Sequence, residues 1–174
     1  MNLSLHAVVV PAFQQTLGAV RGLIDKAEGF CREKNLPPAE LIQARLAPDM
    51  LPFAYQVKST VVHSVGAIEG AKAGVFSPDM SPPPETFEDL RTKVDAALAA
   101  LTRIGAAEID TLIGRDAAFV FRDTRLPFRA EDFLLSFSLP NFYFHAATAY
   151  DILRWKGVSI GKRDFMGRLR LKVS

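Results

Sequence analysis

Two of the three histidines in this sequence fall on helical faces that should point inward, and imidazole is well suited to chemistry there. In the helix expected near the C-terminus, His145 follows Asn141 by one turn. An advance of about 100° per residue places four residues within roughly 60° of one another, namely Asn141, His145, Thr148 and Ile152. That helix therefore turns an amide and an imidazole toward the same inward face.

A second predicted helix carries His63 at the edge of its inner stripe, with Gln56 one heptad earlier on the same side. Neutral imidazole ligates Zn, Ni or Fe, and facing helices of a bundle are a common place for such sites. We therefore name His63, Asn141 and His145 as candidate metal ligands, and we assign no catalytic or cofactor-binding residue. The alternative is structural: His145 hydrogen-bonds Asn141 or a backbone carbonyl, and His63 is partly exposed.

The other residues that could react or bind a ligand are better explained by structural roles. Cys31 lies on an apolar stripe, which indicates a buried, inert thiol, and a single cysteine permits no internal disulfide. His6 precedes the first predicted helix and is interpreted as a surface residue. Gly66, Gly70 and Gly74 give the second helix a side of small residues, which favours close helix packing; a dimer contact or a pocket floor is the alternative.

Long amphipathic helices are needed to position these residues, and their apolar stripes and caps predict where they run. The four helices are expected from Pro11 to Asn35, from the N-cap Asp49 to Gly74, from the N-cap Thr86 to Gly105, and from Pro140 to Gly157. This pattern predicts an all-α fold, a four-helix bundle, with residues 1–174 forming a single domain.

Shorter elements are expected between the long helices. A short helix is predicted over Ala39–Leu46 and another over Ile109–Ile113. Before the last helix the pattern breaks, and Ala117–Arg122 with Leu126–Arg129 predict a small hairpin. Pro127 would confine the second strand to an edge, because proline has no N–H to donate.

The composition predicts a cytoplasmic protein without a membrane partner. At 49% hydrophobic and 23% charged residues, the chain supports a sizeable core and a polar surface. The longest apolar run, Ala7–Phe13, is interrupted by Pro11 and is far shorter than the roughly 20 residues of a membrane span. The N-terminus lacks the basic residues of a secretory signal. Basic residues crowd the C-terminus, and we interpret them as a solvated tail rather than a nucleic-acid surface.

Several strings of the sequence resemble a known family. They read LPNFYFH from Leu139 to His145, AYDILR from Ala149 to Arg154, IGKRDF from Ile160 to Phe165, APDM from Ala47 to Met50 and VPAF from Val10 to Phe13. Together they resemble an uncharacterised domain-of-unknown-function family within the DinB/YfiT-like superfamily. The resemblance implies a four-helix bundle in up-down-down-up order with an insertion before the last helix. It also implies a homodimer, because many members are dimeric.

Many members of that superfamily bind Zn or Ni through three histidines, and some are thiol-dependent transferases or isomerases. By this resemblance His63 matches the ligand on the second helix and His145 the second histidine of a pair on the fourth. Asn141 stands in place of the first histidine of that pair, which puts a weaker carboxamide ligand there. The expected function is a metal-dependent transferase or hydrolase with a core pocket for a small-molecule ligand. The alternative is a non-catalytic dimeric binding or scaffold protein with a structural His/Asn cluster.

Overall fold

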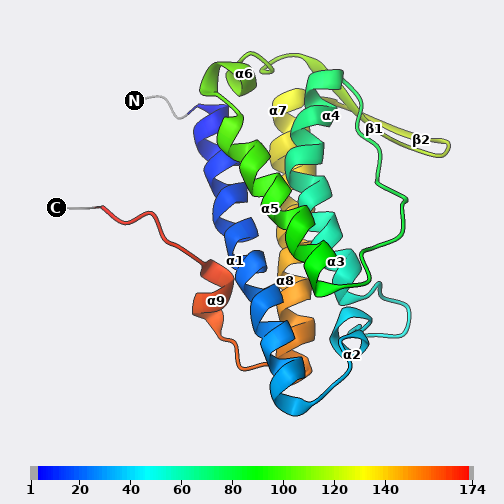
Figure 1. Ribbon diagram of the computed structural model, residues 1–174. Coiled ribbons are helices and arrows are strands. Elements are labelled where there is room, and N and C mark those ends of the chain that lie inside the picture. Colours follow the sequence, from blue (N-terminus) through cyan, green and yellow to red (C-terminus); the bar gives the residue numbers. More distant parts are fainter. Residues whose placement is uncertain (1–3, 173–174) are drawn as a thin grey trace.

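Long helices make up most of the structure, a computed structural model that describes residues 4–172 (Figure 1). The long helical segments are α1 (Leu5–Lys34), a continuous rod through α3 (Phe53–Val61), η1 (Val62–Gly66) and α4 (Ala67–Ala73), α5 (Phe87–Arg103), and a second continuous rod through α7 (Ala130–Asp132), η2 (Phe133–Ser138) and α8 (Leu139–Trp155). The short helices are α2 (Ala39–Ile42), α6 (Ala106–Asp110) and α9 (Lys162–Met166). The long segments lie side by side, with α3 against α8 and α1 against both α5 and α8.

A two-stranded antiparallel sheet corrects the expectation of a purely all-α fold. Strand β1 (Asp116–Phe121) pairs with β2 (Thr124–Arg129), so the predicted hairpin is present before the last rod. Arg122 makes the tight turn with a left-handed backbone, φ 52°. Phe76 pairs with β1 on its other side, which leaves β2, with Pro127 in it, at the edge. Strand β2 is thus paired on one side only, which suits Pro127 because proline has no N–H to donate to a further strand.

The first helix begins six residues before its predicted start at Pro11. The Ser4 side chain accepts a hydrogen bond from Ala7 N–H at 3.2 Å and caps the helix there. Pro11 then lies inside α1, where it removes one backbone hydrogen bond. Leu5 and Val9 are buried, so packing of the first turns offsets that loss.

The last rod begins at Ala130, ten residues before the predicted start at Pro140. The π-helix η2 ends at Ser138, so the backbone ladder is already irregular where Pro140 lacks its N–H. The expected stop is close to the observed one: α8 ends at Trp155, and Gly157 follows with φ 90°. A proline that marks a helix start in sequence can therefore stand inside a rod that contains a π turn.

Helix α1 has the length and composition of a membrane span, although the sequence offers no long uninterrupted apolar run. Within residues 4–172 it is the one such helix, with a mean hydropathy of 1.2 over its most apolar 18-residue window, half of which is buried. Its apolar side chains face the protein core, where the Phe13 ring packs edge-on against Phe142 at a centroid distance of 4.8 Å.

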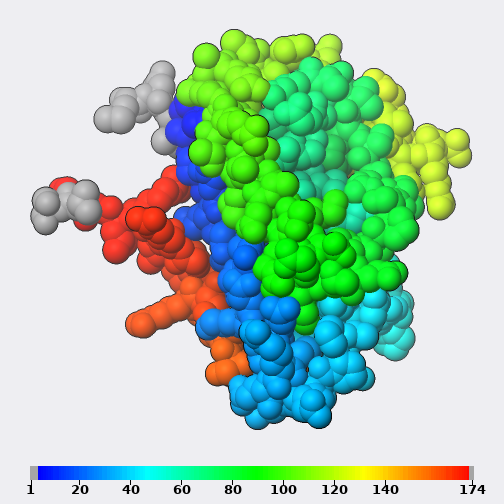
Figure 2. Space-filling view, in the orientation of Figure 1, coloured from blue at the N-terminus to red at the C-terminus, as the bar shows by residue number. Residues whose placement is uncertain are grey.

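Helix α9 lies against α1 (Figure 2), and Gln15 of α1 donates to the Met166 carbonyl at 2.8 Å.

Among the small residues of the second rod, Gly70 allows a close contact within the chain. A Cβ atom added there would lie 2.7 Å from Cβ and 3.1 Å from Cα of Phe76. Real Cβ atoms do not approach so closely, so glycine is needed where the chain after α4 turns back along the helix. Glycine therefore permits a close approach at this position, but the neighbour is the segment after α4 and not the facing helix that the sequence favoured.

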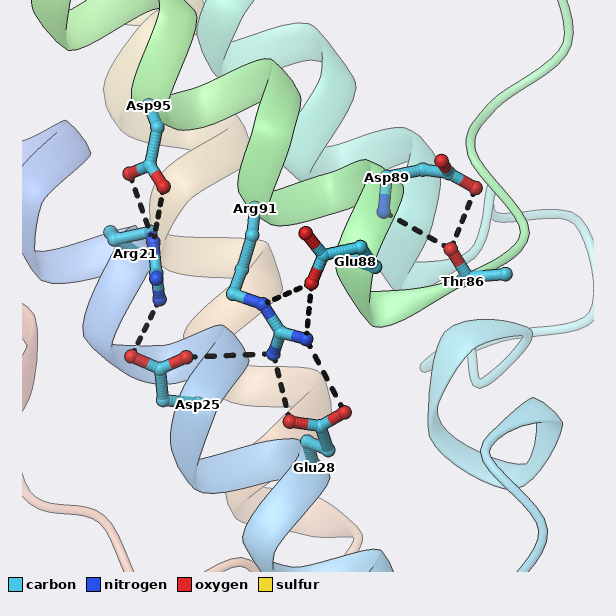
Figure 3. Close-up of polar contacts among 8 residues, drawn as sticks. All are labelled: Arg21, Asp25, Glu28, Thr86, Glu88, Asp89, Arg91 and Asp95. Atoms are coloured by element: carbon cyan, nitrogen blue, oxygen red, sulfur yellow. Dashed lines mark hydrogen bonds and ion pairs between the residues drawn. The ribbon is translucent and has the colours of Figure 1, made fainter.

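Ion pairs join the outer surfaces of α1 and α5 (Figure 3). Arg91 donates to Glu28 at 2.8 Å and to Glu88 at 2.8 Å, and Arg21 donates to Asp95 at 2.9 Å. Thr86 caps α5 as predicted: its hydroxyl oxygen accepts from the backbone N–H of Asp89 at 3.0 Å. The Arg91–Glu28 and Arg21–Asp95 pairs thus link the two helices from the solvent side.

Candidate functional site

The structure brings His63 and His145 together from two different rods. His63 lies in η1 and His145 in α8, and their ring centroids are 5.7 Å apart with the planes inclined by 20°. Both side chains are half-buried. Residues 82 positions apart in the sequence thus form one pair because α3 and η1 pack along α8.

Gln56 fixes the protonation of His145. Its amide nitrogen donates to the Leu51 carbonyl at 2.8 Å, and a carbonyl can only accept, so the amide oxygen must face the imidazole. That oxygen is 2.7 Å from His145 Nδ1, which therefore carries the proton and donates it. The free lone pair of His145 is left on Nε2.

Ser138 does the same for His63. Its hydroxyl donates to the backbone carbonyl of His63 at 3.1 Å, which uses its only proton. The same oxygen is 3.3 Å from His63 Nδ1 and accepts from it. His63 therefore also carries its proton on Nδ1. In residues 4–172, no hydrogen-bond partner meets Nε2 of either His63 or His145.

Both imidazoles are neutral at pH 7. Burial, followed by repulsion from His145, lowers the pKa of His63 to about 4. Burial lowers the pKa of His145 to about 4. A neutral imidazole with a free Nε2 lone pair is the form that binds a metal ion or accepts a proton.

Asn141 belongs to the same face of α8 but turns its amide toward its own helix. Its nitrogen donates to the Phe137 carbonyl at 2.7 Å, four residues earlier. The expected hydrogen bond between His145 and Asn141 is thus not the one formed, since Gln56 is the partner of His145. The amide oxygen of Asn141 remains the group that this residue could offer to a ligand.

The two π-helices within residues 4–172 meet at the histidine pair. His63 lies within η1, and Ser138, the last residue of η2, contacts it directly. A π turn widens the helix locally and shifts the direction of its side chains, and such turns are frequent at functional sites. Here the two irregular segments face each other, and their hydrogen bonds to one another fix the orientation of His63.

Aromatic rings surround the pair. Phe76 and Phe137 lie 5.4 and 6.0 Å from the His63 ring, and Tyr55 and Phe144 lie 6.0 and 5.3 Å from the His145 ring, centroid to centroid. Phe144 is 58% exposed, so the site approaches the surface beside it. The arrangement offers two oriented nitrogen lone pairs in a mostly apolar setting.

The remaining candidates lie apart from this pair. His6 Nε2 lies 3.1 Å from the Ile104 carbonyl, to which it is hydrogen-bonded at the loop after α5. Cys31 is buried, as expected, and burial raises the pKa of its thiol. Among residues 4–172, no group of three or more His, Cys, Asp or Glu side chains is arranged to hold a metal.

Sequence reasoning missed Ser138 and the role of Gln56. Ser138 precedes His145 by one heptad, so a helical period carried back beyond Pro140 would have placed both on one face. Gln56 was noticed on the side of His63, but it pairs with His145. The missing signal was three-dimensional, because it depends on which side of α8 packs against α3.

The chain matches a known family and is similar to a solved structure. The profile of the family described as Domain of unknown function (DUF1993) matches residues 5–166. Among solved structures, a DinB family member protein from Shewanella denitrificans is similar, with a TM-score of 0.81 and 25% sequence identity. The match covers 98% of this chain and 96% of that one. The comparison with curated proteins found no match.

Proposed function

We propose that this chain, which belongs to the DUF1993 family and has a DinB-like fold, binds a divalent transition metal, Zn or Ni, at its His63–His145 pair. The metal would serve transfer or hydrolysis of a small molecule. The observation that carries the proposal is the shared state of the two imidazoles: each donates Nδ1–H to a fixed partner and keeps a free lone pair on Nε2. Metal-binding histidines are typically held in this way by a second hydrogen bond.

The finer fold proposed with it is a four-helix bundle in up-down-down-up order. Figure 1 supports this order, because the rod α3–η1–α4 and helix α5 run in the same direction, while α1 and α8 run the opposite way. Two parallel neighbours need a long connection, and the loop of residues 74–86 supplies it.

The donor set of the pair fits a metal in part. His63 and His145 would supply two nitrogen ligands, and the amide oxygen of Asn141, one turn before His145 on α8, is the candidate for a third. A bound Zn or Ni supplies Lewis acidity, which lowers the pKa of a water or thiol and makes it a nucleophile near pH 7. Gln56 and Ser138 hold the imidazoles in orientation and tautomer, and the surrounding phenylalanines limit access of water.

The proposal is tested by the metal content of tag-free protein, measured by plasma mass spectrometry after incubation with Zn or Ni and desalting. About one metal ion per chain is expected in the wild type, with loss in His145→Ala and in His63→Ala. His6→Ala is the matched control, because the third histidine lies apart from the pair and should leave the metal content unchanged.

Metal retained by both pair variants, or absent from the wild type, would contradict the site. Loss of metal in His6→Ala as well would also contradict it, because binding would then not be specific to the pair. Far-UV circular dichroism of each variant shows whether it folds, so that loss of metal is attributed to the ligand and not to unfolding.

A second function is favoured by the same hydrogen bonds. Because Gln56 and Ser138 tie the two rods together, the cluster also fits a structural role in a non-catalytic binding or scaffold protein. For such a protein we propose a homodimer. In that case His145→Ala destabilises the fold by roughly 1–3 kcal/mol, since Gln56 loses its partner, and added metal leaves the melting temperature unchanged. Light scattering would report a dimer; a monomer at micromolar concentration would contradict this second function.

A further inference from the structure

Two adjoining hollows lie between the rod α3–η1–α4, helix α5 and the loop that joins them. One of about 570 Å³ is lined by Pro82 and Pro84 of the loop and by alanines of α5. The other, of about 490 Å³, reaches along η1 and α4 to Val75 and Phe76. Val61, Val65 and Lys93 line both, so the two hollows meet at these residues. The candidate residues His63, Asn141 and His145 line neither of them.

A buried lysine holds the loop that walls these hollows. Lys58 of α3 is 1% exposed, and its ammonium group donates to the backbone carbonyls of Asp79 at 2.8 Å and Ser81 at 2.5 Å. It also lies 3.2 Å from the Asp79 carboxylate. A buried charge is costly unless it is paired and hydrogen-bonded, so this arrangement fixes the loop over the helix. The hollows are therefore part of the folded shape and do not depend on a loosely placed loop.

The charges along the hollows leave one cation without a partner. Two of the three acids pair with a lysine, Asp79 with Lys58 and Glu69 with Lys72 at 2.8 Å. The third, Asp89, makes no ion pair among residues 4–172; it lies in the first turn of α5, where its carboxylate accepts from the Thr86 hydroxyl at 2.6 Å and the helix N-terminus favours a negative charge. Lys93 likewise has no ion pair in the described part of the chain, although it is half-buried at the junction of the two hollows. The other lining side chains are mostly valine, alanine and proline. An apolar groove with one free ammonium group complements an apolar molecule with one acidic group.

We propose that these hollows form a single binding site for a small amphipathic carboxylate, whose apolar body lies along Val61 and Val65 and whose carboxylate pairs with Lys93. The volumes fall in the range of small-molecule sites, roughly 300–1,000 Å³. A charge-assisted hydrogen bond to a partly buried ammonium group distinguishes the acid from a neutral molecule of the same length. The two histidines line neither hollow, although Phe76 contacts His63 and also lines the smaller hollow, and the proposal does not depend on a bound metal.

Decanoate and decanol are suitable probes, because they share an apolar chain and differ in the charged group. Isothermal titration calorimetry on the wild-type protein should show decanoate binding about tenfold more tightly than decanol. In Lys93→Met that preference should disappear while the affinity for decanol stays the same. Lys172→Met is the matched control: it removes an exposed lysine outside the groove and should keep the tenfold preference.

A second pair of variants locates the site. Ala96 lines the larger hollow and is exposed, so Ala96→Trp should fill the groove and abolish binding of both probes without unfolding the helix. Ala99 is exposed on the same helix but lines neither hollow, so Ala99→Trp should bind as the wild type does. Absence of decanoate binding to the wild type, equal affinity for the two probes, or binding unchanged in Ala96→Trp would each overturn the proposal.

Discussion

Two interfaces between helices satisfy their polar side chains in opposite ways, one with neutral hydrogen bonds and the other with ion pairs. The histidine interface, between α3–η1 and η2–α8, is made of His63, His145, Gln56 and Ser138, all neutral and all hydrogen-bonded within the protein. The ion-pair interface, between α1 and α5, is made of Arg21, Arg91 and their carboxylate partners (Figure 3). The side chains of the histidine interface are buried or half-buried, whereas the ion-pair interface lies nearer the surface.

The difference follows from the cost of removing charge from water. A charged imidazole in the histidine interface would lose hydration without a carboxylate to replace it, so burial favours the neutral form. In the ion-pair interface Asp25 and Asp95 are each 54% exposed on their side chains, so these carboxylates keep much of their hydration and their pairing contributes little; Arg91, at 16%, keeps less. The histidine interface should therefore respond to pH, and the ion-pair interface to salt.

The largest expected effect is that of acid on the histidine interface. The folded pKa of each histidine is about 4, below its ordinary value of 6.5, so the unfolded chain binds more protons between these values. The stability contributed is fully present above pH 6.5 and is lost as the pH falls toward 4. From pH 7 to pH 5 we expect metal-free protein to lose about 1–2 kcal/mol of unfolding free energy for each imidazole. Urea denaturation at the two pH values measures this.

His145→Leu separates this loss from that of ordinary carboxylates. The variant should show a smaller difference between pH 7 and pH 5 than the wild type, whatever its stability at pH 7. An equal difference in both proteins would mean that His145 does not titrate as its burial implies.

The next effect is that of removing a neutral partner. Gln56→Leu leaves His145 Nδ1–H and the Leu51 carbonyl without their hydrogen bonds, so the unfolding free energy should fall by roughly 1–3 kcal/mol. Gln43→Leu, at an exposed position outside the site, should change it by less than about 0.5 kcal/mol. Urea denaturation of both variants at pH 7 tests the difference, and equal values would remove Gln56 from the interface.

The smallest effect is expected at the ion-pair interface. Arg91→Met removes the pairs with Glu28 and Glu88 and should cost about 1 kcal/mol or less in dilute buffer. In 1 M NaCl the Debye length is about 3 Å, so the cost should shrink further, whereas the loss in Gln56→Leu should not change with salt. A salt-independent loss in Arg91→Met would place its contribution in packing and not in charge.

How much of the fold could be predicted from sequence depends on the regularity of each helix. The stripe of α5 and its Thr86 cap predicted that helix well, because its side chains repeat with the ordinary helical period. The rod that starts at Ala130 was predicted ten residues short, because η2 breaks that period and Pro140 looks like a helix start. The start of α1 was missed for a related reason, since Pro11 stands within it.

For the candidate site, the sequence predicted which histidines lie on inward faces, and the structure pairs His63 with His145. It did not predict the partners Gln56 and Ser138 in their roles, because those depend on how two rods pack and on hydrogen bonds across them. Lys58 was also missed: a lysine in a helix ordinarily reaches solvent, and only the position of the loop at Asp79 shows that it is buried.

The π turn that carries His63 has a consequence for comparing this protein with its relatives. Each hydrogen-bonded ring of a π-helix closes one residue later than that of an α-helix, so η1 contains in effect one inserted residue. Deleting one residue between positions 62 and 66 would restore the ordinary ladder and rotate everything from Ala67 onward by about 100°. Gly70 would then turn away from Phe76. A single-residue gap here in an aligned relative therefore marks an α4 that turns a different face toward η2 and β1.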